Sequence, residues 1–263
     1  MNIESSFNIN SELIITPAQL RKIYMWGVTA KDSNGIELPD DIYEFYIKTA
    51  QQELEDLLNI KLIPTIIKET RDYVYDDYKT YGYVRCSYPV CRAFYLKGMF
   101  GEAEQITYPA AWLSSKKSNE VPNMYYRNVY LIPNVGGYQS GEVSGVTFNG
   151  VFGANLLWRS KSYIPNYWHI RYLTGFNKIP DDLLNVIGKT AAINVLHIAG
   201  DLILGAGIAS YSLGIDGLSQ SISSTSSATN AGYGARILGY VDDLKKVLPI
   251  LISKYGGMSL SVL

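Results

Sequence analysis

A helix start stands in the sequence at Ile179-Pro180-Asp181-Asp182-Leu183. Proline fits the first turn of a helix because its missing N–H group would have no partner there, and the acidic pair suits the positive end of the helix dipole. The helix that follows is apolar on most of its faces, where it carries Leu183, Val186, Ile187, Ala191, Val195 and Ile198. A helix of this kind is buried, so we expect it at the centre of a helical bundle.

The same start occurs earlier, at Leu38-Pro39-Asp40-Asp41-Ile42. The helix after it has one apolar stripe with helical spacing, formed by Tyr43, Ile47, Ala50, Leu54 and Leu58. A further helix is predicted to begin at Thr16-Pro17, with threonine as the N-cap, and to end near Gly27. Nothing else repeats at the period of the two similar starts, so we expect one bundle with an insertion and not a repeat protein.

The insertion, residues 67–175, contains fifteen of the 22 tyrosines. Apolar and polar residues alternate in Thr70–Tyr75 and Trp168–Tyr172, and Gly, Pro and Asn separate such stretches. This pattern is typical of short antiparallel strands with long loops. The predicted fold class is α+β: a small helical bundle (1–66 and 176–212), a Tyr-rich, β-rich insertion (67–175) and an extended C-terminal helix and arm (213–263).

The C-terminal arm, residues 213–263, is predicted to hold a flexible linker, an amphipathic helix and a docking tail. The linker lies in the polar stretch 219–234, which cannot bury enough apolar surface to offset its ordering entropy. Pro249 is expected to kink the helix. We predict an assembly interface with a partner, because an exposed apolar stripe needs one. Its residues are Ile237, Val241, Leu244, Leu248, Leu251, Tyr255, Met258, Leu260 and Leu263. The alternative is that helix and tail fold back onto the chain's own core.

Composition excludes several function classes. The chain has 23 Lys and Arg against 24 Asp and Glu, a net charge of −1, so nonspecific nucleic-acid binding is not expected to be its main role. The N-terminus lacks the pattern of a secretory signal. The apolar stretch 191–209 is interrupted by polar residues, which favours a buried helix and a loop over a membrane span. Cys86 and Cys91 are predicted to be reduced thiols.

Candidate catalytic and ligand sites are few. Gly205-Ala206-Gly207 follows a predicted helix and not a strand, so a helix-ending loop is favoured over a dinucleotide loop. His197 and Asp201 share a helix face, but a locally bonded core histidine is favoured over a metal pair or a general base. The two Asp pairs at the helix starts suit the helix dipole. We therefore expect no enzymatic activity, no cofactor and no metal.

The aromatic residues of the insertion allow two interpretations. They are Trp112, Tyr125, Tyr126, Trp158, Tyr163, Tyr167 and Trp168. Such side chains supply large rigid contact area, so they could form a sugar-binding or interface surface. They could equally fill a small β core. The sequence leaves both interpretations open.

Two stretches resemble the head–tail connector (adaptor) proteins of tailed bacteriophages. One is Tyr172–Leu183, a strand that runs into the central helix. The other is Asp216–Ile222 followed by Ala231–Ile237 and the last helix. With the N-terminal helices, the resemblance covers about half of the chain.

The resemblance implies a non-enzymatic structural virion protein at the neck of the capsid vertex, made in the host cytoplasm. It implies a ring, of twelve copies by analogy with the twelvefold portal, that extends the DNA channel and provides the platform for tail attachment. The implied partners are the portal protein, neighbouring copies and a downstream tail protein. Viral DNA would pass through the channel without specific binding, and no membrane is involved. The alternative function is a carbohydrate-binding or other tail or virion decoration module that uses the aromatic-rich insertion.

Overall fold

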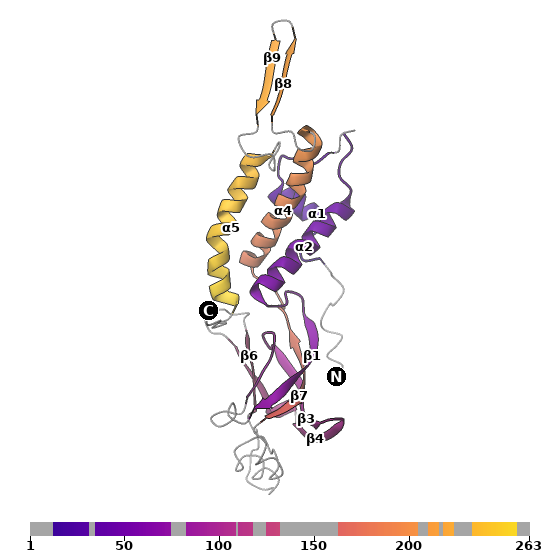
Figure 1. The fold of residues 1–263 in the computed structure, drawn as a ribbon, viewed down its shortest axis with the longest axis vertical. Coiled ribbons are helices and arrows are strands. Elements are labelled where there is room, and N and C mark those ends of the chain that lie inside the picture. Colours follow the sequence, from indigo (N-terminus) through magenta and orange to yellow (C-terminus); the bar gives the residue numbers. More distant parts are fainter. Residues whose placement is uncertain are drawn as a thin grey trace. The chain divides into compact units, whose positions relative to one another are not determined.

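The fold is α+β, as predicted (Figure 1). The structure is a computed structural model and describes residues 13–31, 35–74, 83–108, 110–117, 125–131, 163–204, 210–215, 218–223 and 233–256. The chain divides into two compact units. The β unit holds Asn59–Lys178, and the helical unit holds Asn10–Leu58 together with Ile179–Leu263.

The helical unit is built around one long helix. Its elements are α1 (Pro17–Gln19), the π-helical turn η2 (Leu20–Tyr24), α2 (Asp40–Leu58), α4 (Asp181–Leu204) and α5 (Gly234–Tyr255). Both α2 and α5 pack on α4, which lies between them in Figure 1. The helix with the most apolar sequence is therefore the central one, as its pattern predicts.

The first helical segment begins where the sequence predicts. Thr16 is its N-cap: the Gln19 N–H donates to the Thr16 hydroxyl, and the Gln19 side chain accepts from the Thr16 N–H at 2.9 Å. The segment continues as a π-helical turn, a difference from the expected α-helix. Gly27 follows it with φ +75°, a conformation that favours glycine.

The apolar stripes of α2 and α4 are buried as predicted. Tyr43, Ile47, Ala50, Leu54 and Leu58 on α2 are all buried. On α4, Ile198 is half-buried, and the other predicted positions (Leu183, Val186, Ile187, Ala191 and Val195) are buried. By length and composition the stretch Asp181–Gly200 could cross a membrane, but its burial is that of the core helix of a bundle.

The β unit contains two antiparallel sheets. One has the strand order β1-β7-β3-β4 and the other β2-β6-β5. The strands are β1 (Thr65–Val74), β2 (Tyr83–Arg85), β3 (Arg92–Phe100), β4 (Ala103–Tyr108), β5 (Leu113–Lys117), β6 (Tyr125–Leu131) and β7 (Tyr163–Thr174). Strands β1 and β7, the first and last of the unit, pair along almost their whole length, from Thr65 opposite Thr174 to Val74 opposite Tyr163.

Aromatic residues form the centre of the β unit. Trp168 is fully buried, and the rings of Tyr73, Tyr108 and Tyr167 lie within 6.3 Å of its ring, centroid to centroid. Both sheets contribute to this core, since Val84 of β2 and Val129 of β6 belong to the same cluster. Because each aromatic ring buries a large area, the tyrosine excess of the insertion supplies a core to a unit with short strands.

Two details differ from the sequence-based expectation. The β unit begins at Asn59 and ends at Lys178, beyond the expected limits of 67 and 175. The start of the expected linker belongs to a hairpin, since β8 (Ser210–Ile215) pairs with β9 (Leu218–Ser223). Asp216-Gly217 between these strands is a common two-residue hairpin sequence. Helix α5 runs on to Tyr255 with Pro249 inside it, and the missing N–H of this proline leaves the Lys245 carbonyl without its helical donor.

Alkaline unfolding should report on the tyrosine core. Burial raises the pKa of Tyr108, Tyr167 and Tyr172. In the folded chain these phenols therefore stay neutral at pH values at which they ionise in the unfolded chain. Their contribution to stability is complete below about pH 10 and is lost as the pH rises further. We expect tyrosinate absorbance to rise in two phases, the later one together with loss of near-ultraviolet circular dichroism. A single phase near pH 10 without unfolding would contradict this core.

Candidate functional site

The predicted interface stripe of α5 faces the chain's own helical unit. Ile237, Leu251 and Tyr255 are buried there. Three further stripe residues, Val241, Leu244 and Leu248, are half-buried, and Met258, Leu260 and Leu263 lie outside the described residues. In the structure, helix α5 therefore folds back onto the chain's own core. This is the alternative that the sequence left open.

Polar contacts hold the N-terminal half of α5 in this position. The Arg236 guanidinium donates to the Trp26 carbonyl at 3.0 Å, and the Tyr240 hydroxyl donates to the Tyr24 carbonyl at 2.6 Å. Both acceptors belong to the segment that begins with Thr16, so the start of α5 is attached to the start of the helical unit. These contacts join residues more than 200 positions apart and have no signature in the local sequence.

The middle and the C-terminal end of α5 are attached to α4. Lys189 forms an ion pair with Asp243 at 2.9 Å. At the end of the helix, Asp182 accepts from the Lys254 ammonium at 2.7 Å and from the Tyr255 hydroxyl at 3.1 Å. Asp182 thus has two roles. It interacts favourably with the dipole of α4, as its position predicts, and it anchors the last turn of α5.

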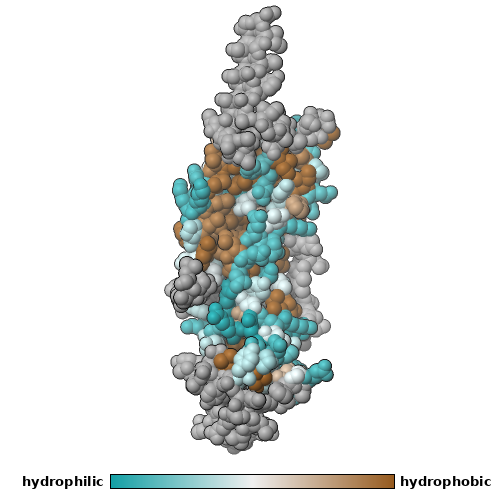
Figure 2. Space-filling model, in the orientation of Figure 1, coloured by the Kyte–Doolittle hydropathy of each residue, from teal (hydrophilic) through white to brown (hydrophobic). Residues whose placement is uncertain are grey.

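The helical unit exposes large apolar side chains elsewhere. On α2 they are Phe45 (62% exposed) and, three turns further on, Leu57; we call the surface around Phe45 the α2 patch. On α5 they are Leu238, Ile250 (65% exposed) and Ile252, which lies on the other side of the helix from Ile250; we call the surface around Ile250 the α5 patch. Figure 2 shows hydrophobic side chains gathered over this part of the unit. Ile23, Trp26 and Ile36 are also exposed. Large contiguous apolar patches mark interaction sites, whereas singly exposed apolar residues are common on protein surfaces.

The sequence contained a signal for the two patches. Both helices have apolar residues outside their buried stripes: Phe45 follows Tyr43 by two positions, and Ile250 and Ile252 flank Leu251. On a helix, such positions point away from the stripe. A strictly amphipathic surface helix would carry polar residues there.

Most of the described aromatic candidates of the insertion are packed into its core or against it. Tyr167 and Trp168 are buried, and Trp112 packs against the core cluster. Tyr126 and Tyr163 are exposed. Trp158 and the side chain of Tyr125 lie outside the described part of the chain. The buried rings cannot stack on a sugar, so the core interpretation holds for them.

The other candidates form no reaction centre in the described part of the chain. His197 is half-buried on α4, whereas the Asp201 side chain and Gly205–Ala209 lie outside that part. No group of three or more His, Cys, Asp or Glu that could hold a metal is found there. Cys86 and Cys91 are separate thiols, and burial raises the pKa of Cys86.

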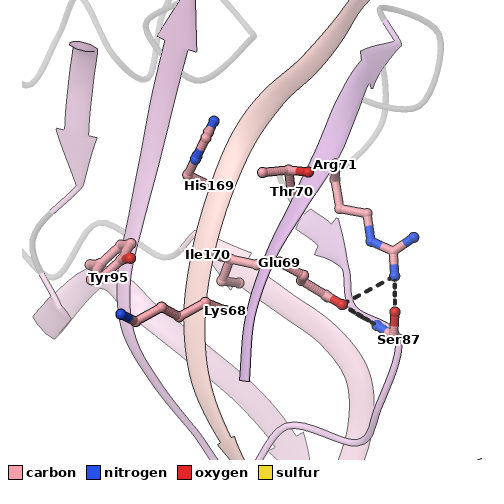
Figure 3. A pocket seen from close by; sticks show the side chains of 8 residues that line it. All are labelled: Lys68, Glu69, Thr70, Arg71, Ser87, Tyr95, His169 and Ile170. Atoms are coloured by element: carbon pink, nitrogen blue, oxygen red, sulfur yellow. Dashed lines mark hydrogen bonds and ion pairs between the residues drawn. The ribbon is translucent and has the colours of Figure 1, made fainter. Parts of the chain in front are cut away.

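A polar pocket of about 520 Å³ opens on the four-stranded sheet (Figure 3). Its lining residues are Lys68, Glu69, Thr70, Arg71, Ser87, Tyr95, His169 and Ile170. Glu69, Arg71 and Ser87 are tied to one another, since the Ser87 N–H donates to the Glu69 carboxylate at 3.0 Å and Arg71 donates to the Ser87 hydroxyl. Figure 3 shows Lys68 and Tyr95 away from this group.

Comparison with known proteins adds no assignment: no protein-family model matches the chain, and no curated protein sequence matches it.

Proposed function

We propose that this chain is a head–tail adaptor, a non-enzymatic virion protein that forms a ring of twelve copies on the portal. The ring extends the DNA channel and offers a platform for the tail. The observation that carries the proposal is the pair of exposed apolar patches on α2 and α5 of one helical unit. The resemblance of Tyr172–Leu183 and of the C-terminal stretches to adaptor proteins points to the same role.

Two different patches on one chain are what a ring requires. A head-to-tail interface joins one surface of a subunit to a different surface of the next, and it closes into a ring when the rotation allows. The α2 patch and the α5 patch lie on two different helices, both of which pack on α4. In the proposed ring, the α5 patch of one copy contacts the α2 patch of its neighbour.

The ring is tested by cross-linking the chain after incubation with the portal protein. Wild-type chains should give a ladder of products up to twelve copies. Phe45→Asp and Ile250→Asp should each give only monomers, since each removes one half of every interface. An equal mixture of the two variants should give dimers and nothing larger, because one intact α2 patch can meet one intact α5 patch.

The controls place an aspartate at exposed polar positions. Lys48→Asp on α2 and Ser253→Asp on α5 should assemble like the wild type, since surface changes of this kind cost within about 0.5 kcal/mol. A full ladder from Phe45→Asp or Ile250→Asp would exclude the patches as the interface. No cross-linked product from the wild type on portals would exclude the ring.

A further inference from the structure

We infer that the outer face of the four-stranded sheet in the β unit binds the phosphodiester backbone of a nucleic acid, through Lys68, Arg92 and Arg171. This role goes beyond ring assembly and does not depend on it, because the whole surface belongs to one chain. The whole-chain net charge of −1 conceals this face, since it averages over surfaces of different sign.

The strand register places the three cations together. Lys68 of β1 lies directly opposite Arg171 of β7. Arg92 of β3 lies opposite Leu173, which is two residues along β7 from Arg171 and on the same face. Adjacent strands are about 4.8 Å apart, so the backbones that carry the three cations form one compact group. Lys68 and Arg92 are exposed.

One aromatic ring orients two of these cations. The guanidinium carbons of Arg171 and Arg92 lie 5.4 and 5.9 Å from the centroid of the Phe94 ring. Each is thus held by a cation–π contact, which brings two like charges to the same ring. A phosphate group between guanidinium groups accepts hydrogen bonds from both and neutralises them. The arrangement is therefore preorganised for an anion.

The carboxylates of the sheet stand away from this group. Glu104 of β4 pairs with Lys97 at 2.6 Å, and the Glu69 carboxylate accepts from Ser87 on the side of the sheet that faces the core. Asp72 accepts from the Asn166 N–H and the Tyr163 hydroxyl at the other end of β1. Like charges directly opposite on a sheet are destabilising, and an anion bound at Lys68 and Arg171 would remove that repulsion.

The shape of the site favours a polymer over a small ligand. The cations are spread over three strands of an open sheet face, beside a pocket of about 520 Å³. Small ligands are mostly enclosed by their pockets, whereas a nucleic acid presents a row of phosphates to such a face. The half-buried rings of Tyr95 and His169 lie among these residues and offer contacts to bases.

Fluorescence anisotropy of the full chain with labelled oligodeoxythymidine, and with a duplex of equal length, tests the inference. Three phosphate contacts give a slope of log affinity against log salt of about −2 for the single strand and about −2.7 for the duplex. Single-strand affinity should therefore fall about fifteenfold between about 50 and 200 mM salt. Lys68→Gln and Arg92→Gln should each weaken binding and bring the slope closer to zero by about 0.7 to 0.9.

The matched control is Lys116→Gln, an exposed lysine on β5 of the other sheet, which should bind like the wild type. Phe45→Asp should also bind like the wild type, so a failure of the ring leaves this result intact. No binding at about 50 mM salt, or an equal loss in Lys116→Gln, would overturn the inference. Equally tight binding of polyglutamate, with the same dependence on Lys68, would assign the face to an acidic protein segment instead.

Discussion

Gly175→Ala should strongly destabilise the β unit. Gly175 has φ +101°, which L side chains rarely adopt, and a Cβ atom there would lie 2.4 Å from the Ile63 carbonyl oxygen. Because this oxygen belongs to the backbone, it cannot move aside as a side chain would. The two costs together reach at least about 3 kcal/mol, a large part of the roughly 5–15 kcal/mol that stabilises a typical domain. Urea unfolding followed by circular dichroism measures the loss.

Two other glycines distinguish the cost of the positive φ from the cost of the close approach to the backbone. Gly101→Ala has the same problem of positive φ (+60°) but no atom within 4 Å of the new Cβ, so it should cost only about 1–2 kcal/mol. Gly239→Ala lies in α5 with open space around it and should stabilise the chain by about 1 kcal/mol. If the three variants unfolded at the same urea concentration, the close approach at Gly175 would be refuted.

The sensitivity of Gly175 follows from its place at the base of the insertion. Thr65 and Thr174 are the first pair of the β1–β7 ladder, and the Phe176 N–H donates to the Leu62 carbonyl at 3.1 Å. The Cys91 thiol donates to the Gly175 carbonyl at 3.0 Å. The strand that enters the β unit and the strand that leaves it are therefore neighbours. This adjacency explains how a long insertion can interrupt a helical unit, since its two ends already lie side by side.

The helices could be predicted because their signals are local. The stripe of α2 depends only on the helical period and was fully recovered, from Tyr43 to Leu58. The cap at Thr16 depends on residues within three positions. The hairpin of β8 and β9 also had a local signal in Asp216-Gly217, but the polar composition after it suggested a linker. Short-range pairing outweighed composition there.

The placement of α5 could not be predicted, because an apolar stripe shows that a helix has a partner and not which one. Its partner is the helical unit of the same chain, and the contacts that decide this join Tyr240 to Tyr24 and Tyr255 to Asp182. The cationic face of the four-stranded sheet could not be predicted from the sequence either. Lys68, Arg92 and Arg171 are far apart in the sequence, and only the strand register brings them together.

Asp182→Ala should release the C-terminal turn of α5. The substitution removes the acceptor of the Lys254 ammonium and of the Tyr255 hydroxyl, and Tyr255 is fully buried. Removal of the acceptor of a buried hydroxyl costs about 1–3 kcal/mol. We expect a loss of that size in urea unfolding, and faster amide hydrogen exchange at the end of α5 than at its start, where Arg236 still holds the Trp26 carbonyl.

Asp181→Ala is the matched control. Asp181 occupies the same first turn of α4, so both variants lose the interaction with the helix dipole, but Asp181 is exposed and no hydrogen bond joins it to Lys254 or Tyr255. Its cost should stay near 0.5 kcal/mol, as is typical for an exposed dipole contact. Equal exchange rates in the two variants would show that the anchor at Asp182 contributes nothing.

The pH dependence of the anchor has a definite sign. The hydrogen bond to Asp182 raises the pKa of Lys254, and burial raises the pKa of Tyr255. Both groups keep their protons to higher pH in the folded chain, so the anchor is complete below about pH 10 and weakens as the pH rises through the folded pKa values. The difference in stability between the wild type and Asp182→Ala should therefore shrink at alkaline pH. A difference that grew instead would contradict the assignment.

Asp182→Ala also tests which face of α5 takes part in the proposed assembly on the portal. If the inward stripe around Ile237 and Leu251 binds the portal, α5 must first leave its own unit, and Asp182→Ala should strengthen attachment because it lowers the cost of release. If α5 stays packed and the outward α5 patch around Ile250 contacts the neighbouring copy in the proposed ring, attachment should weaken, since the patch loses its fixed position and the ring on the portal is less stable. The packing of α5 and the exposure of Ile250 favour the second outcome. Portal binding by Asp182→Ala, measured beside Asp181→Ala, therefore separates a docked helix from a released arm.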